Sequence, residues 1–168
     1  PRVERAIAAW ALAGNTADHE AVKALIDETA VGPRQQLFGM LPWIGWADLA
    51  QAKSLGQPPR LERLWQGLRS VTLNEVDPRT ATADMLPVAA FLASMQKSSA
   101  DRSLKLLDLL VVSPHESRFF RSPTQAVGGV RLAPWNERMP VWAQTLGILL
   151  LCEALEQLDE PLLKEPNS

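Results

Sequence analysis

The chain has 168 residues, of which 46% are hydrophobic and 21% charged, a composition typical of a folded globular protein with about one domain. Its formal net charge of −2 provides no basic stripe for a nucleic-acid backbone or an anionic membrane, so DNA and RNA binding are not expected. A single cysteine, Cys152, excludes an internal disulfide, and the longest apolar run, 145–152, is far shorter than the roughly 20 residues of a membrane span. The chain begins at Pro1 without an initiator methionine, which favours a processed protein or part of a larger one.

The sequence pattern predicts an all-α fold of about seven helices in antiparallel hairpins. Tyrosine is absent and no segment alternates apolar and polar residues for long, so no substantial sheet is expected. In the first half, we expect Val3, Ile7, Trp10 and Ala11 to form one stripe of the first helix. Pro42 should kink or split the third helix. The expected helices of this half are 2–13, 17–30, 34–54 and 59–73.

A polar connection at 74–82 is a candidate boundary between two lobes of the single domain 1–168. Two helices should follow, at 83–97 with Pro87 in the first turn, and at 101–112 with Ser98, Ser99 or Asp101 as the cap. The connection 113–140 is long, a closing helix covers 141–158, and the tail 160–168 is expected to fray.

The closing helix is the most apolar in the chain, with no charged residue from Thr145 to Cys152. A helix that is apolar on every side needs neighbours on every side, so we expect it at the centre of the fold. The six tryptophans are spread over the chain, which favours packing between helices over a shared binding site.

Two segments carry a family resemblance. Residues 91–96 (FLASMQ) resemble the first half of the repeat of squalene and oxidosqualene cyclases, which contains an aromatic residue and a glutamine. Residues 128–135 (GGVRLAPW), followed by a polar turn and a long apolar helix, resemble a loop-to-helix transition of the α/α-toroid group. That group includes terpenoid cyclases and protein prenyltransferases, and the resemblance, within about 88–158, implies helical hairpins around a cavity.

The catalytic motifs of that group are absent from the sequence. Lys97 to Ala100 replace the Gly-x-Trp half of the repeat, and neither an Asp-x-Asp-Asp run nor an Asp-x-Cys zinc motif is present. The resemblance therefore implies, as the alternative function, a small enzyme or a degenerate relative acting on an isoprenoid-like or carbohydrate substrate.

For the other candidate catalytic and metal-binding residues, a structural role explains the sequence better than a chemical one. Ser113, His115 and Glu116 are the residue types of a catalytic triad, but such neighbours in sequence are typical of a turn or helix cap. Gly128-Gly129 is interpreted as a turn that needs positive φ. No spacing of His, Cys or acids indicates a metal or cofactor site, so no catalytic residue and no cofactor is assigned.

The long connection contains the best candidate binding residues, because arginines alternate there with aromatic residues. Arginine can bind a carboxylate in a fork, and aromatic rings can stack on sugars or guanidinium planes. The structural alternative is a loop held by Trp135, Phe119 and Phe120, with arginines capping helix carbonyls. Glu153 is added because burial on the closing helix would raise its pKa. The candidate residues are Arg121, Gln125, Arg131, Trp135, Asn136, Arg138 and Glu153.

The leading hypothesis is a non-catalytic helical binding or interaction module with a ligand or peptide surface on loop 113–140. Its partner would be a protein or a small molecule, and whether the chain is an enzyme stays open. Self-association as a homo-oligomer is a third hypothesis, which depends on an exposed apolar face.

Overall fold

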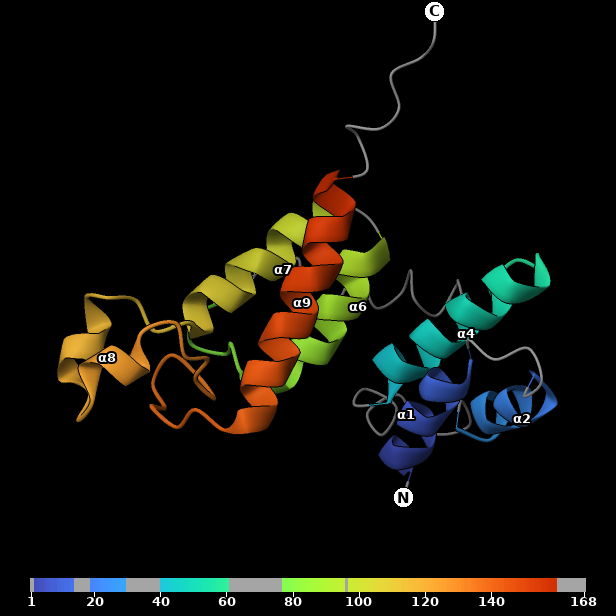
Figure 1. The fold of residues 1–168 in the computed structure, drawn as a ribbon, viewed down its shortest axis with the longest axis horizontal. Coiled ribbons are helices and arrows are strands. Elements are labelled where there is room, and N and C mark those ends of the chain that lie inside the picture. Colours follow the sequence, from blue (N-terminus) through green and yellow to red (C-terminus); the bar gives the residue numbers. More distant parts are fainter. Residues whose placement is uncertain (1, 14–18, 30–39, 61–76, 96, 160–168) are drawn as a thin grey trace, which may run out of the picture. The chain divides into compact units, whose positions relative to one another are not determined.

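The computed structural model describes residues 2–13, 19–29, 40–60, 77–95 and 97–159, and within these ranges the fold is all-α, without a sheet (Figure 1). The chain divides into two compact units, 1–71 and 72–168, and each is described by itself. The predicted helix 59–73 beyond Arg60, the predicted cap at Asn15 or Thr16 and the tail 160–168 lie outside the described residues. No helix within the described ranges is both long and apolar enough to cross a bilayer.

Unit 1 contains α1 (Arg2–Leu12), α2 (His19–Thr29) and α4 (Leu41–Leu55), which pack against one another. The buried face of α1 is made of small residues, Ala6 and Ala9, and Ala13 directly after the helix is buried as well. The predicted stripe was wrong for Val3, Ile7 and Ala11, which are exposed. Alanine at the contact lets neighbouring helix backbones approach closely, and this moved the buried face away from the larger side chains.

Three tryptophans pack together between α1 and α4. The ring centroids of Trp10, Trp43 and Trp46 lie 5.2 to 5.7 Å apart in tilted arrangements, which are favourable geometries for aromatic pairs. The prediction that these tryptophans serve packing is confirmed.

The helix α4 runs without interruption from Leu41, and residues 34–39, which the predicted kink or split at Pro42 would join to it, lie outside the described residues. Pro42 lies in the first turn, where the missing backbone N–H has no partner to lose and the fixed φ suits a helix. At the other end Gly56 has φ +62°, a left-handed conformation that glycine adopts without strain, and its N–H donates back to the last turn. Gly56 therefore ends α4 at Leu55.

Unit 2 is built on three packed helices, α6 (Leu86–Met95), α7 (Lys97–Leu110) and α9 (Val141–Asp159). A short 3₁₀ turn, η2 (Ala83–Met85), precedes α6, and Pro87 lies in the first turn of α6 as predicted. Nearly every residue of α6 from Leu86 to Ala93 is buried, because α6 contacts both α7 and α9. The most enclosed helix of the unit is therefore α6.

Helix α7 begins earlier than predicted. It starts at Lys97, so Ser98, Ser99 and Asp101 lie within the helix and do not cap it. Ser99 and Ser103 are buried, and the Ser103 hydroxyl donates to the Ala89 carbonyl of α6 at 2.7 Å. Of the three predicted cap residues only Ser99 is buried, while Ser98 and Asp101 are exposed on the first turns of α7.

The bounds of α9 agree closely with the prediction, but its predicted complete burial was wrong. Ala143, Gly147, Leu150 and Ala154 face the other helices. The opposite side is open to solvent, with Val141 81% and Ile148 62% exposed. The helix is apolar all round, yet within the described residues only one side of it is covered.

Candidate functional site

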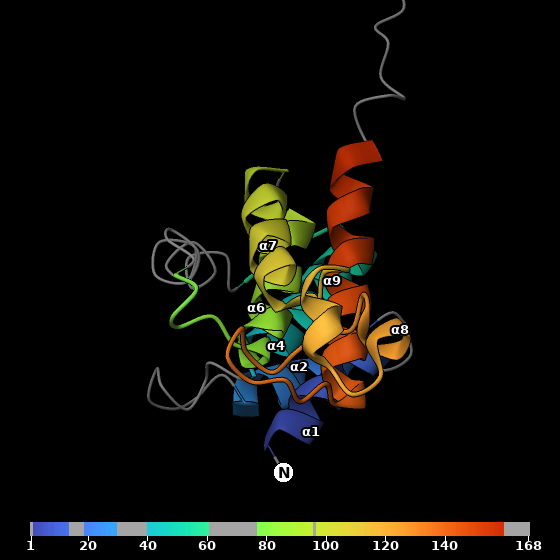
Figure 2. The same ribbon diagram turned by 90° about the vertical axis from the view of Figure 1, so that its left-hand side faces the viewer.

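The connection between α7 and α9 is an ordered loop at the end of unit 2 where α7 ends and α9 begins (Figure 2). It contains a 3₁₀ turn, η3 (Glu116–Phe119), and one turn of helix, α8 (Pro123–Ala126). Val111 and Val130 form an isolated antiparallel bridge, and Val112 exchanges backbone hydrogen bonds with Gly128 and Gly129 at 2.9 Å. The loop therefore returns along the end of α7, and Gly128 has the predicted positive φ, +79°.

Ser113 and Glu116 form a reciprocal cap at the start of η3. The Ser113 N–H donates to Glu116 Oε2 at 3.0 Å, and the Glu116 N–H donates to the Ser113 hydroxyl at 3.2 Å. This is the pattern of a capping box. The interpretation of Ser113-Pro114-His115-Glu116 as a cap is confirmed, and His115 lies instead against the Phe119 ring with centroids 6.5 Å apart.

Arg131 joins this cap to the end of α7. Its guanidinium donates to the carbonyls of Leu109, Leu110 and Pro134 at 3.2 to 3.4 Å and to Glu116 Oε1 at 3.1 Å. The last carbonyls of a helix lack partners within the helix, and a cation there also suits the helix dipole. Arg131 is buried, so its guanidinium serves the fold of the loop.

The interactions around Glu116 favour its charged form. Hydrogen bonds from the Ser113 backbone and hydroxyl, followed by the positive charge and hydrogen bond of Arg131, lower the pKa of Glu116 against the opposing effect of burial. The arginine and glutamate form an ion pair of 3.1 Å in which the arginine is the buried partner. We call Ser113, Glu116 and Arg131 the Arg131 cluster.

A second set of contacts holds the loop to α9. The Gln144 side chain accepts from the Val130 N–H and donates to the Val130 carbonyl, both at 2.8 Å, as a neighbouring strand would. One turn later Gly147 gives Val130 room, because a Cβ there would lie 2.9 Å from Val130 Cγ2 and 3.3 Å from Leu107 Cδ1. The sequence pattern missed Gln144, because nothing local marks a helical glutamine that bonds a distant backbone, and it missed the pairing of Glu116 with Arg131.

Large side chains point outward from this fixed backbone. Phe119 is 77% exposed and Trp135 is 59% exposed, so neither holds the loop in place as the structural alternative expected. Three arginines of the same loop, Arg118, Arg121 and Arg138, are exposed, and their guanidinium groups form no ion pair with any described residue. We call these five residues the loop surface.

The remaining candidate residues differ in position. Gln125 is exposed on α8, and the Asn136 side chain accepts from the Arg138 N–H at 3.2 Å, so it shapes the turn. Glu153 lies on α9, well outside the loop in sequence, and burial followed by the nearby charge of Glu156 raises its pKa. The structure thus places Arg121, Gln125, Trp135 and Arg138 on the outside of the loop and Arg131 inside it.

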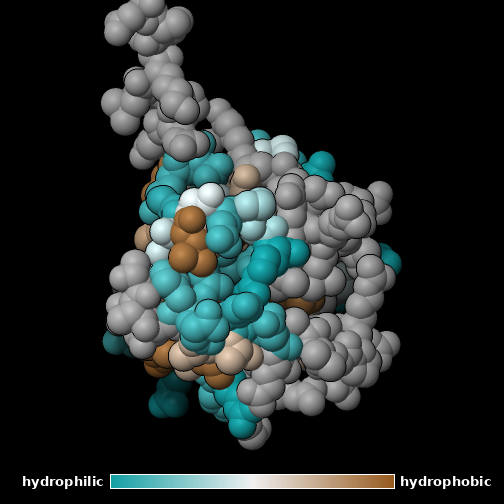
Figure 3. Space-filling model, turned by 90° about the vertical axis from the view of Figure 1, so that its right-hand side faces the viewer, coloured by the Kyte–Doolittle hydropathy of each residue, from teal (hydrophilic) through white to brown (hydrophobic). Residues whose placement is uncertain are grey.

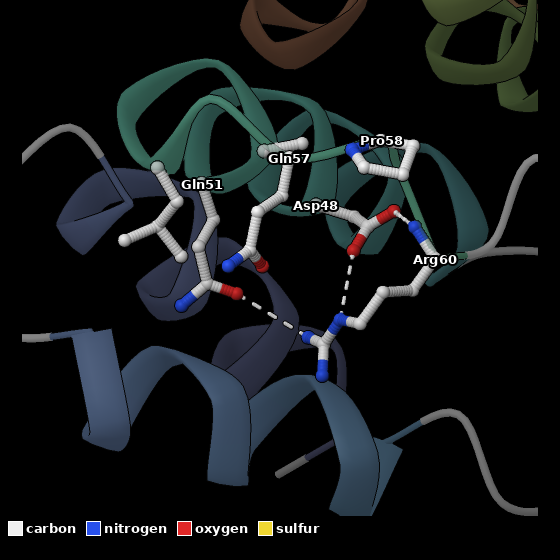
Figure 4. A pocket seen from close by; sticks show the side chains of 7 residues that line it. Asp48, Gln51, Gln57, Pro58 and Arg60 are labelled. Atoms are coloured by element: carbon white, nitrogen blue, oxygen red, sulfur yellow. Dashed lines mark hydrogen bonds and ion pairs between the residues drawn. The ribbon is translucent and has the colours of Figure 1, made fainter.

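Unit 1 contains a pocket of about 470 Å³ between α2 and the end of α4, most of whose lining residues have polar or charged ends. Arg60 joins the elements here: it donates to both carboxylate oxygens of the buried Asp48 and to Gln51 Oε1 at 3.3 Å (Figure 4). It also pairs with Asp27 of α2 at 3.4 Å. The pocket is lined by His19, Glu20, Lys23, Gln51, Leu55, Gln57 and Arg60.

The charges of this region offset one another. Lys23 lies near Glu20, and Arg60 faces two carboxylates, so no excess of one sign would attract a charged ligand. The face drawn in Figure 3, where the described residues are mostly hydrophilic with small separate apolar patches, fits a solvated surface. We therefore place the candidate site on the loop surface of unit 2.

The described residues provide no metal centre, since no three His, Cys, Asp or Glu side chains among them come together. Comparison with protein-family models, with curated proteins and with solved structures finds no match.

Proposed function

We propose that the chain is a non-catalytic helical interaction module whose partner surface lies on loop 113–140. The observation that supports this proposal is the contrast between a backbone held by internal hydrogen bonds and the large aromatic side chains that it exposes. Solvent-exposed Phe119 and Trp135 do not stabilise the fold by burial, so a role outside the chain explains them better.

The chemistry of the loop surface indicates a class of partner. Tryptophan, phenylalanine and arginine are enriched where proteins bind other proteins, because they combine apolar area with a few directed donors. Arg121 and Arg138 can each bind a carboxylate through two parallel N–H groups. We therefore expect a protein segment that presents an acidic side chain next to apolar ones.

The fixed backbone supports binding because little conformational freedom is lost when the partner arrives. Ordering a flexible loop subtracts from the affinity, whereas the Arg131 cluster and Gln144 hold this loop before binding. Arg131 is thus a positioning residue in this proposal, and the side chains that touch the partner are those of the loop surface.

The proposal can be tested by selecting peptides from a displayed random library on the full chain and measuring their affinity by titration calorimetry. Selected peptides should combine Asp or Glu with aromatic or aliphatic residues. Trp135→Ala should weaken their binding about 30-fold, as expected for loss of a residue worth about 2 kcal/mol at an interface.

A matched control is Lys105→Ala, which removes an exposed positive charge from α7 outside the loop. Lys105→Ala should leave the peptide affinity unchanged, whereas Arg138→Ala should weaken that affinity. Neither variant should lower the melting temperature. If no peptide is enriched on the wild-type chain, or if Trp135→Ala binds as tightly as wild type, the loop surface is not a binding site. The resemblance to the α/α-toroid group, and the enzymatic alternative that it implies, stay predictions.

A further inference from the structure

The segment at which the described part of unit 2 begins is bonded to loop 113–140. The Ala83 N–H donates to the Leu132 carbonyl at 2.8 Å, and the two segments lie side by side in Figure 1. Ala83 is fully buried, so water cannot take the place of this bond. Because a buried polar group that loses its partner is costly, the contact with Ala83 fixes the position of Leu132.

Leu132 begins the turn that carries two residues of the loop surface. Its N–H donates to the Arg138 carbonyl at 2.8 Å and closes the segment 132–138 on itself. Trp135 and Arg138, both exposed, belong to this segment. We call residues 132–138 the Trp135 turn. The residue that closes the Trp135 turn is therefore the one that is bonded to the start of unit 2.

The residues before Ala83 form a turn that is bonded to itself. The Asp77 carbonyl accepts from the N–H groups of Thr80 and Ala81, each at 3.0 Å. The Asp77 side chain accepts from the Arg79 N–H at 2.8 Å, and Ala81 is buried. A segment with its own hydrogen bonds does not absorb a displacement as a flexible linker would. A shift of the chain at Asp77 is therefore passed on to Ala83.

We propose that the bond between Ala83 and Leu132 makes the start of unit 2 a positioning element for the loop surface, so that the affinity of the Trp135 turn for its partner depends on segment 77–83. This inference rests on the proposed function, since it concerns the same site. Ala83 and Leu132 act through their backbone groups and do not touch the partner. Unit 1 precedes segment 77–83 along the chain, so a change in unit 1 that displaces this segment would alter binding at the loop.

The coupling works in both directions. If opening of the Ala83–Leu132 bond prevents binding, the partner must stabilise that bond by the same factor by which the bond favours the partner. A peptide at about 100 times its Kd would then reduce the opening of the bond on the order of 100-fold. A bond whose opening leaves the Trp135 turn closed would not respond.

Amide hydrogen exchange of the full wild-type chain, followed by NMR, measures this coupling. A selected peptide at about 100 times its Kd should slow exchange of the Ala83 amide by roughly 10-fold or more. The internal control is the Met85 amide, which donates within η2 to the Thr82 carbonyl at 3.1 Å and should slow much less. An unchanged rate at Ala83, or equal slowing of the two amides, would overturn the proposal.

Replacing the backbone amide of Ala83 by an ester tests the bond directly. The α-hydroxy acid analogue of alanine, incorporated at position 83, removes the N–H and keeps the side chain. Exchange of the Leu132 amide should become about fivefold faster, the factor expected for one neutral hydrogen bond. The selected peptide should bind more weakly, because a smaller fraction of the chains then holds the Trp135 turn closed.

The same replacement at Met85 is the matched control. The ester at position 83 also weakens the Thr82 carbonyl as an acceptor, and this carbonyl accepts the Met85 N–H. The ester at position 85 removes that second bond and leaves the bond to Leu132 in place. It should therefore change neither the exchange of Leu132 nor the affinity for the peptide. Equal effects of the two esters would show a general loss of stability and would overturn the positioning role.

Failure of this proposal and failure of the proposed function give different results. If no peptide binds the wild-type chain, the proposed function fails, and exchange at Leu132 in the two ester variants still decides whether the bond positions the Trp135 turn. If peptides bind the wild type and the ester at position 83 equally well, the loop surface remains a binding site and the coupling is refuted.

Discussion

Removing the side chain of Arg131 tests whether this arginine stabilises the fold of the loop or binds a partner. Its guanidinium makes four hydrogen bonds, to the carbonyls of Leu109, Leu110 and Pro134 and to the Glu116 carboxylate. The three carbonyl bonds, at 3.2 to 3.4 Å, are longer than the usual distance of about 2.9 Å, so each contributes at the low end of its range.

The expected cost follows from these contacts. Breaking a buried pair by removing one partner costs about 3–5 kcal/mol, but the Glu116 side chain is 39% exposed and keeps its Ser113 bond, which reduces the penalty. The Leu110 carbonyl also keeps its bond from the Arg131 backbone. We predict that Arg131→Ala lowers the free energy of unfolding by about 3 kcal/mol. Arg131→Lys should recover little of it, because lysine cannot reach the same acceptors as a fork.

Urea unfolding followed by circular dichroism measures the loss of unfolding free energy in Arg131→Ala. Hydrogen exchange with mass spectrometry should show faster exchange of this variant at residues 109–138. The control is Arg118→Ala, an exposed arginine of the same loop, which should change stability by less than about 0.5 kcal/mol. If Arg131→Ala were as stable as wild type and lost binding instead, the guanidinium would be a ligand group and the structural role of the Arg131 cluster would be refuted.

Three further predictions concern α9 and its neighbours. Glu153→Gln should raise the melting temperature at pH 7. The pKa of Glu153 is raised in the folded chain, which means that the charged carboxylate opposes folding. The gain should disappear as the pH falls below the unfolded pKa of about 4.5. Gly147→Ala should destabilise by about 1 kcal/mol although alanine favours helices, since its Cβ would lie 2.9 Å from Val130 Cγ2. Ser103→Ala should cost about 1 kcal/mol through the lost bond to the Ala89 carbonyl.

Each of these predictions has a matched control. Glu156→Gln, an exposed neighbour of Glu153, should raise the melting temperature less; an equal gain would show that net charge and not burial is responsible. Combining Gly147→Ala with Val130→Ala should recover part of the lost stability in a double-mutant cycle, and additive effects would contradict the steric reason. Ser98→Ala, an exposed serine of the same helix, should be neutral, and a loss equal to that of Ser103→Ala would point to helix propensity instead.

Glu116 has the opposite pH dependence to Glu153. Because its pKa is lowered in the folded chain, its contribution to stability is present above the unfolded pKa and is lost as the pH falls through the lower, folded value. Wild type and Glu116→Gln should therefore differ in stability at neutral pH and converge in acid.

The helices could be predicted where periodicity and terminal signals agree. The bounds of α1 and α9 lie close to the predicted ones, because apolar spacing and flanking Gly or Pro mark them in the sequence. The role of Pro42 could not be predicted, because a first-turn proline and a kinking proline have the same local sequence and only the position of the helix start separates them.

Which side of each helix is buried could not be predicted from a single sequence. In α1 the buried side is that of its alanines, which face the packing with α2 and α4, and the exposed side of α9 depends on how many neighbours the fold supplies. The arginines of the loop look equivalent in the sequence. Only the path of the chain brings Arg131 beneath the end of α7 while Arg121 and Arg138 remain outside.

The central claim is that Arg131 and Gln144 hold the backbone of loop 113–140 and that the loop surface, with Trp135 exposed on it, binds a protein partner. The affinity of a selected peptide for Trp135→Ala tests this claim most directly. That affinity should fall about 30-fold while the melting temperature stays that of wild type. An unchanged affinity would contradict the claim.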